Sequence, residues 1–184
     1  DVTVKLGQDR QITIHENSLV EDWEITMVDT GEQTLKGARI HKIAKYIDDD
    51  FMITYGDGMS DIDINSLVSF HKKHGKIATM TGVSPRSSYG QITAEDGKVL
   101  DFIEKPKFDE GVVNGGFFIF QKKFFDYLNP NDDCDFEIGP LEQLTKEGQL
   151  MVYHHKGDWI CMDTYRDSVF LNNLWKKGQA FWKA

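Results

Sequence analysis

The chain has 184 residues, of which 40% are hydrophobic and 12% aromatic, enough to bury the core of one domain. Its 30 acidic residues outnumber its 21 basic ones, the formal net charge is −9, and no basic stripe occurs, which argues against nucleic acids and anionic membranes as partners. No apolar run approaches the ~18 residues of a membrane span, so we expect a soluble, cytoplasmic protein.

Strand and helix patterns alternate in the first half of the chain. The stretch "FMITY" is apolar on both faces, as expected for a parallel strand covered by helices. The following helix can be capped by Asp63 or Ser60 and ended by Gly75, and the strand–helix–strand order over 51–83 predicts a βαβ unit. The predicted elements are strands at 11–16, 23–31, 51–55 and 76–83, and helices at 37–47 and from Ile64 to Gly75.

The second half mixes hairpin, strand and helix signals. Asp96-Gly97 joins two alternating runs, which predicts a β-hairpin. Thr164 and Asp167 have the spacing of a capping box, and Asp135 can cap the helix that Gly148 ends. The predicted elements are a hairpin within 90–106, strands at 112–121, 150–155 and 159–162, and helices at 122–128, 135–148 and 164–178. The order of elements predicts a single α/β domain over 1–184, with a mixed, mostly parallel, Rossmann-like sheet flanked by helices.

Two aspartates follow predicted strands at positions suited to a metal. Asp57 lies between two glycines directly after "FMITY", and Asp163 follows the strand at 159–162. Ligands of open α/β sheets bind beyond the carboxyl ends of the strands, and Mg²⁺ takes carboxylate oxygens. The alternatives are a simple Gly-Asp-Gly turn for Asp57 and a helix N-cap for Asp163.

Two further stretches suit a phosphorylated sugar. Glu104 and Lys105 precede Pro106, and a bend there allows a carboxylate to accept sugar hydroxyls while a cation meets phosphate. An exposed ion pair is the alternative. Asn114 stands beside two glycines, which indicates either a bulged strand or a close ligand approach. Cys134 and Cys161 lie outside any Cys-x-x-Cys or Cys/His spacing, so neither a disulfide framework nor a zinc site is predicted.

The motifs "MVDTG", "GARI", "ITYGDG", "FIEKPK", "NGGFFIF" and "MDTYRD", in this order, resemble those of the sugar-1-phosphate nucleotidyltransferases. The resemblance runs from near residue 15 to the C-terminus. It implies a fold of the nucleotide-diphospho-sugar transferase type and the formation of CDP-glucose and pyrophosphate from CTP and α-D-glucose 1-phosphate. It further implies Mg²⁺ as cofactor, a homo-oligomer, and a place in deoxysugar and surface-polysaccharide biosynthesis.

The resemblance also implies roles for individual residues. The resemblance implies that Asp57 and Asp163 are the Mg²⁺ ligands and that these two residues and Lys105 are the catalytic residues. It implies that Glu104 accepts hydrogen bonds from sugar hydroxyls and that Lys105 contacts the sugar phosphate. Asn114 and Gly115 are expected to line the sugar pocket. Nucleotide contacts are expected from Thr34, Gly37, Arg39 and Gly56.

The sequence departs from this family at one point. Family members open with a Gly-rich "GG.GTRL" loop, followed by a lysine, that holds the triphosphate, and no such run occurs here. We therefore expect an N-terminally truncated domain that is inactive alone, although the longer protein would be an enzyme.

Two other functions stay open. In a metal-dependent glycosyltransferase, the "DID" of 61–63 would be the acidic motif, but Asp61 and Asp63 lie where helix caps belong. The alternative is a noncatalytic sugar-nucleotide-binding or assembly module.

Overall fold

The computed structural model describes residues 2–5, 11–14, 24–85, 90–104 and 112–183. Its strands are β1 Val2–Lys5, β2 Gln11–Ile14, β3 Phe51–Thr54, β4 Gly58–Ser60, β5 Ala78–Val83, β6 Gln91–Glu95, β7 Lys98–Ile103, β8 Val113–Phe120, β9 Leu150–His155 and β10 Trp159–Cys161. Its helices are α1 Lys36–Lys42, α2 Ile64–His74, α3 Pro140–Lys146 and α4 Tyr165–Lys176, with 3₁₀ turns η1 Ala44–Tyr46 and η2 Lys122–Tyr127. No helix of the described residues combines the length and the hydrophobicity of a membrane span.

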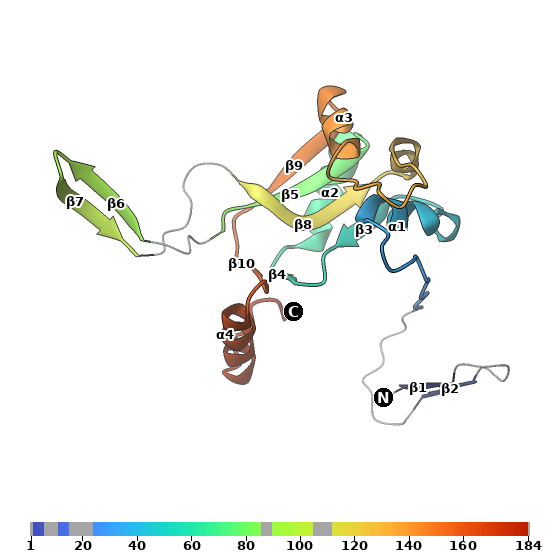
Figure 1. Cartoon of the computed structure of the whole chain (residues 1–184), viewed down its shortest axis with the longest axis horizontal. Helices are drawn as coiled ribbons and strands as arrows, with labels where there is room; N and C mark the ends of the chain where they lie inside the picture. Colours follow the sequence, from blue (N-terminus) through green and yellow to red (C-terminus); the bar gives the residue numbers. More distant parts are fainter. Residues whose placement is uncertain (1, 6–10, 15–23, 86–89, 105–111, 184) are drawn as a thin grey trace.

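The central sheet has four strands in the order β3-β8-β5-β9 (Figure 1). β5 pairs parallel with β9, whereas β8 pairs antiparallel with both β3 and β5. Three strands therefore run one way and β8 runs against them, which confirms the predicted mixed sheet. Only the β5–β9 pairing is parallel, and β3 pairs antiparallel with β8, because β8 lies between β3 and β5. The predicted order β3, α2, β5 is present, but β8 lies between the two strands because it enters from a later part of the chain.

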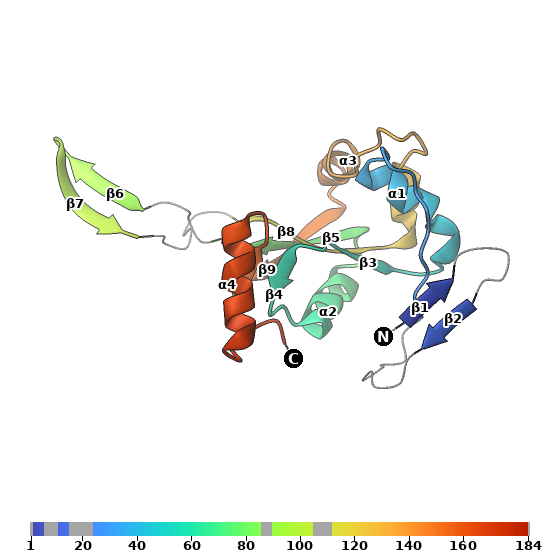
Figure 2. The same cartoon turned by 60° about the horizontal axis from the view of Figure 1, so that its bottom comes forward.

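Helices cover both faces of this sheet. α1 and α3 lie on one face and α2 lies on the other (Figure 2). Phe118 and Phe120 are two residues apart on β8 and so share a face, where Phe120 stacks on Phe124 with a ring-centroid distance of 3.9 Å. Phe136 meets these rings edge-on. This aromatic cluster packs α1 and α3 against the sheet and, through Phe136, holds the loop that precedes α3.

Several local signals in the sequence are confirmed. Asp63 is the N-cap of α2 and accepts hydrogen bonds from two backbone N–H groups, and Gly75 ends that helix with a φ of 65°. Thr164 and Asp167 form the capping box of α4. Asp96 and Gly97 both have positive φ, as the two-residue turn between β6 and β7 requires.

The strand predicted at 23–31 is wrong for residues 24–31, which form no strand. Its alternating hydrophobic side chains have nothing to pack against, since Ile25 is 72% and Met27 83% exposed. An extended segment becomes a strand only when a neighbour takes up its backbone hydrogen bonds. Among the described residues, no strand is placed to do so for this segment.

The predicted helix at 135–148 begins later, at Pro140. The residue before a proline is kept out of the helical region, and Gly139 accordingly has a φ of 95°. Asp135 is therefore not the N-cap; its carboxylate accepts the backbone N–H of Glu137 at 3.1 Å. The helix predicted at 37–47 ends at Lys42 and continues as η1, and 122–128 forms a 3₁₀ turn rather than an α-helix.

A buried chain of polar groups joins α2 to β5. The Lys76 backbone N–H donates to His74 Nδ1 at 2.9 Å, so the proton of the neutral ring lies on Nε2, which donates to Thr79 Oγ1 at 2.7 Å. The Thr79 hydroxyl then donates to His71 Nδ1 at 2.7 Å. His71 Nε2 faces Asp50 Oδ2 at 3.9 Å, too far for a hydrogen bond. This arrangement suits two neutral rings.

The stability of the fold is expected to fall as the pH drops from 7 to 5. Burial lowers the pKa of His71 and of His74, with the Asp50 charge opposing the effect at His71. Since the unfolded histidines take up protons below about 6.5 and the folded ones do so only at lower pH, stability is lost below that pH by up to roughly 1.4 kcal/mol per pH unit and histidine. Urea unfolding at several pH values measures this slope. His71→Gln should flatten it and His154→Gln, at an exposed position, should not; an equal slope in both variants would contradict the prediction.

Candidate metal and sugar-phosphate site

The two aspartates singled out in the sequence lie together in the structure. β4 and β10 form a short antiparallel ladder in which Gly58 lies opposite Cys161, and the Met162 N–H donates to the Asp57 carbonyl at 2.8 Å. Asp57 precedes β4 and Asp163 follows β10, so the ladder places their side chains side by side. A carboxylate oxygen of each, together with Cys161 Sγ, lies within 4.8 Å of the others. Their role as metal ligands stays a prediction.

Neither aspartate has the alternative role considered from sequence. The N-cap of α4 is Thr164, not Asp163. Within the described part of the chain, no hydrogen bond to the Asp57 carboxylate is found, so this side chain does not stabilise its own turn. Asp163 Oδ1 accepts a hydrogen bond from the Cys161 thiol at 3.2 Å. Burial, this hydrogen bond and the charges of both aspartates raise the pKa of Cys161 to about 12.

The donor set fits a hard divalent cation. The carboxylate oxygens of Asp57 and Asp163 lie within 4.8 Å of each other. Among the described residues, no Lys or Arg forms an ion pair with either of them. Like charges this close repel each other, and a cation between them relieves the repulsion. Mg²⁺ binds one or two carboxylates and leaves its other positions to water and substrate phosphates, which suits an open pair of this kind.

The glycines of β8 lie directly beside this pair. The register between β5 and β8 shifts between Met80 and Gly82, so the "NGG" stretch is a bulged strand, and Gly116 has a φ of 78°. The Gly115 carbonyl accepts the Trp159 Nε1–H at 2.8 Å. Trp159 is the first residue of β10, and a Cβ on Gly58 of β4 would lie 3.8 Å from the same Gly115 carbonyl. Gly115 of β8 therefore contacts the β4–β10 ladder that the two aspartates flank.

A polar cluster missed by sequence reasoning fixes Asn114. The half-buried Glu137 carboxylate accepts hydrogen bonds from Tyr55 Oη at 2.6 Å, from Asn114 Nδ2 at 2.7 Å, and from Lys36 Nζ. Asn114 Oδ1 in turn accepts the Gly116 N–H at 2.9 Å, so both ends of the amide are held. We call Lys36, Tyr55, Asn114 and Glu137 the Glu137 cluster. Only the folded chain reveals it, because its members come from distant segments.

The predicted nucleotide contacts near α1 have structural partners. The Arg39 guanidinium donates to the Thr34 carbonyl at 2.7 Å and to Thr30 Oγ1 at 2.6 Å. Thr34 is buried and its hydroxyl donates to Asp132 Oδ1 at 3.1 Å. Arg39 and Thr34 thus shape the loop that enters α1. The structure does not place them in contact with Asp57 or Asp163, and their contact with a nucleotide stays a prediction.

The two glycines predicted at the nucleotide differ in their surroundings. A Cβ on Gly37 would lie 2.8 Å from the Cys134 carbonyl, from Cys134 Sγ and from the Phe136 nitrogen, whereas a Cβ on Gly56 would meet nothing within 4 Å. Gly37 is required by packing, and Gly56 stands on open surface next to Asp57.

Gly37→Ala is therefore expected to lower the free energy of unfolding by about 1–3 kcal/mol, the usual cost of overpacking. Gly56→Ala should leave the stability within about 0.5 kcal/mol, as for other surface changes. If Gly56 lies beneath the ribose, the second variant should instead weaken CTP binding. Urea denaturation and calorimetric titration with CTP give both quantities, and equal stability of the two variants would show that Gly37 is not constrained by Cys134.

Glu104 lies away from the aspartate pair. It follows β7, at the root of the β6–β7 hairpin that projects from the sheet (Figure 1). A Cβ on Gly90 would lie 3.1 Å from its carboxylate, which places Glu104 beside the start of β6. The structure thus does not bring Glu104 to Asp57 or Asp163. Lys105 lies outside the described residues.

The acidic motif of the rival glycosyltransferase is engaged in structural hydrogen bonds. Asp61 Oδ1 accepts the Asp158 N–H at 2.8 Å and lies 2.8 Å from His155 Nε2, so Asp61 ties the loop before β10 to β4 and is not the helix cap that was predicted. Asp63 caps α2. Neither carboxylate belongs to the group that Asp57, Cys161 and Asp163 form.

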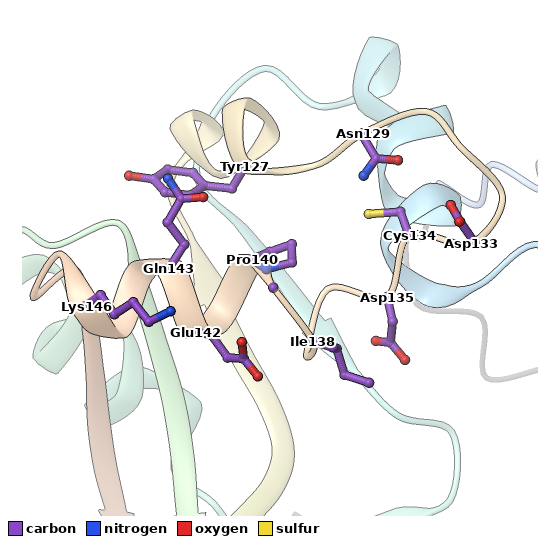
Figure 3. A pocket seen from close by; sticks show the side chains of 11 residues that line it. Tyr127, Asn129, Asp133, Cys134, Asp135, Ile138, Pro140, Glu142, Gln143 and Lys146 are labelled. Carbon is purple, nitrogen blue, oxygen red and sulfur yellow. The ribbon is translucent and has the colours of Figure 1, made fainter.

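A hollow lies between η2 and α3. Its volume is about 550 Å³, and three carboxylates, two amides and one lysine face it (Figure 3). Asp135 lines this hollow, and its Oδ2 lies 3.6 Å from Lys36 Nζ. The hollow therefore adjoins the Glu137 cluster. None of the residues predicted from sequence to bind substrate lines it.

Comparison with known proteins places the chain in a family. The nucleotidyl transferase family model matches residues 6–181, and the chain belongs to this family. It is 43% identical over 185 aligned residues to the glucose-1-phosphate cytidylyltransferase of Salmonella typhi, an alignment that covers 100% of the chain and 71% of that relative.

Solved structures confirm the fold. A Bacillus anthracis protein thought to be a glucose-1-phosphate thymidylyltransferase superposes with a TM-score of 0.59 and 18% identity over 78% of this chain and 62% of that one. HddC from Yersinia pseudotuberculosis gives a TM-score of 0.55 and 23% identity over 76% and 61% of the two chains. The chain thus spans about three fifths of these structures, and they share its mixed sheet flanked by helices.

Proposed function

We propose that this chain transfers a cytidylyl group from CTP to α-D-glucose 1-phosphate, forming CDP-glucose and pyrophosphate. The observation that carries the proposal is the convergence of Asp57 and Asp163 beside Gly115, in a chain 43% identical to a glucose-1-phosphate cytidylyltransferase. A sugar-phosphate oxygen attacks the α-phosphorus of the nucleotide in line, and pyrophosphate leaves.

Asp57 and Asp163 hold Mg²⁺ in this proposal, and the ion offsets negative charge on the nucleotide phosphates. A cation is needed because two polyanionic substrates must meet on a protein of net charge −9. Asn114 and Gly115 line the sugar pocket, where the Glu137 cluster orients the Asn114 amide.

The other roles rest on the motifs alone. Glu104 accepts sugar hydroxyls and Lys105 meets the sugar phosphate, which requires the hairpin root to approach the ladder of β4 and β10. Gly56 lies beneath the ribose, where its surroundings are open. Arg39, Thr34 and Gly37 shape the loop that receives the nucleotide.

Pyrophosphate release is the direct test. Two proteins are incubated with CTP, glucose 1-phosphate and Mg²⁺. One is the 184-residue chain, and the other is a chimera in which the parts of the Salmonella typhi relative that lie outside the alignment are joined to this chain. We expect release by the chimera, and binding without release by the chain alone, since no "GG.GTRL" run is present to hold the triphosphate. A chimera that binds both substrates without releasing pyrophosphate would support the noncatalytic module instead.

We also propose that the protein acts in the cytoplasm as a homo-oligomer. Val169, Phe170 and Trp175 of α4 are 41%, 47% and 55% exposed. Contact with a second copy would remove this apolar surface from water, which favours association. Light scattering of the chimera at micromolar concentration should give a mass of two or more chains, and a monomer would contradict the proposal.

A further inference from the structure

Cys161 adds a third donor atom to the aspartate pair. It is the last residue of β10, lies opposite Gly58, and is two residues before Asp163. Its Sγ lies within 4.8 Å of carboxylate oxygens of both Asp57 and Asp163 and is partly buried. The thiol donates its hydrogen to Asp163 Oδ1, so the sulfur faces the carboxylates.

A sulfur donor changes which cations the centre prefers. Carboxylate oxygens suit Mg²⁺ and Mn²⁺, whereas a thiolate is a soft ligand that favours Zn²⁺ and other thiophilic ions. Zn²⁺ readily takes a mixed set of cysteine sulfur and aspartate oxygens, and three protein ligands leave one position free for water or substrate.

We propose that Cys161 makes this centre a binding site for thiophilic divalent cations, which displace Mg²⁺ from Asp57 and Asp163. The cation binds the sulfur and one oxygen of each carboxylate, and the thiol proton is released to solvent. The inference concerns the same aspartates as the proposed function, but it stands on the position of Cys161 and would hold for a chain without transferase activity.

Metal titration of the 184-residue chain tests the proposal without an activity assay. CdCl₂ is added stepwise, and the thiolate-to-cadmium charge-transfer absorption in the ultraviolet reports sulfur ligation. Competition with MgCl₂ and MnCl₂ gives the relative affinities. The matched control is Cys134→Ser, because Cys134 is the only other cysteine and its Sγ packs against Gly37, away from the aspartates.

We expect one equivalent of Cd²⁺ to produce the absorption in the wild type and in Cys134→Ser. Cys161→Ser should abolish it and weaken Cd²⁺ binding by about 100-fold or more, because losing a direct ligand costs at least as much as losing an outer-shell partner of one, with little effect on Mn²⁺. Asp57→Asn should weaken both ions. ¹¹³Cd NMR of the wild type reports sulfur ligation independently, should Cys161→Ser fail to fold.

Absence of the absorption in the wild type, or its persistence in Cys161→Ser, would overturn the inference. Cd²⁺ ligation by Cys161 in a chain whose chimera releases no pyrophosphate would refute the proposed function alone. Pyrophosphate release that depends on Mg²⁺, with no Cd²⁺–sulfur absorption, would refute the thiophilic site alone.

Discussion

Asp57→Asn and Asp163→Asn are each expected to lower kcat for pyrophosphate release by about 100- to 10,000-fold. Both changes remove a charge that holds the cation, whose stabilisation of the transition state is worth several kcal/mol, and each 1.4 kcal/mol is a factor of ten. The fold should persist, since no structural hydrogen bond to Asp57 is found in the described part of the chain. Steady-state kinetics of the active chimera measure the loss.

A metal readout distinguishes this effect from misfolding. Mg²⁺ should raise the melting temperature of the wild type, because the ion relieves repulsion between carboxylates that converge within 4.8 Å. Neither Asn variant should respond to Mg²⁺ in this way. Their melting temperatures without metal should equal or exceed that of the wild type, since each variant removes one of two like charges.

Asp61→Asn is the matched control. Asp61 lies near the same ladder, but its carboxylate accepts the Asp158 N–H and contacts His155, so its loss should lower stability and leave kcat nearly unchanged. If Asp61→Asn abolished turnover while Asp57→Asn stayed near wild type, the metal assignment would be wrong and the glycosyltransferase hypothesis would gain support.

Local signals in the sequence were sufficient for features whose cause is local. The cap at Asp63, the Asp96-Gly97 turn and the capping box of α4 each depend on hydrogen bonds or dihedral angles within a few residues. The sequence placed Asp57 and Asp163 each after a predicted strand, but the contact that joins them was not predicted. Asp57 precedes β4 and Asp163 follows β10, and the antiparallel pairing of these two short strands, outside the central sheet, brings the carboxylates together.

Features that depend on distant partners could not be predicted. The run at 24–31 has the alternation of a strand, but a strand forms only where another backbone completes its hydrogen bonds. The insertion of β8 between β3 and β5 is a choice of partner that no single strand encodes. No metal site was predicted at Cys161 because it lies outside any Cys-x-x-Cys or Cys/His spacing, although it stands only two residues before Asp163 on one short segment.

Glu137→Ala is expected to lower the free energy of unfolding by about 1–3 kcal/mol, because it leaves the Tyr55 hydroxyl, the Asn114 amide and the Lys36 ammonium without their shared acceptor. Burial alone would raise the pKa of Glu137, but hydrogen bonds from Lys36 and Tyr55 lower it further than burial raises it. The stabilisation is therefore complete above the unfolded pKa near 4.5 and is lost as the pH falls through the lower folded value. Urea denaturation at pH 7 and at acid pH measures it.

The same variant tests whether Glu137 positions Asn114 for the sugar. The amide oxygen is held by the Gly116 N–H and its nitrogen by Glu137, so removing the carboxylate frees the amide to rotate. A positioning role predicts a higher KM for glucose 1-phosphate with an unchanged KM for CTP in the chimera, whereas general destabilisation would lower kcat and affect both substrates. Glu147→Ala is the matched control, because Glu147 also accepts a tyrosine hydroxyl at 2.6 Å, from Tyr127, but lies on exposed surface. Equal sugar KM values in Glu137→Ala and Glu147→Ala would leave Glu137 with a structural role only.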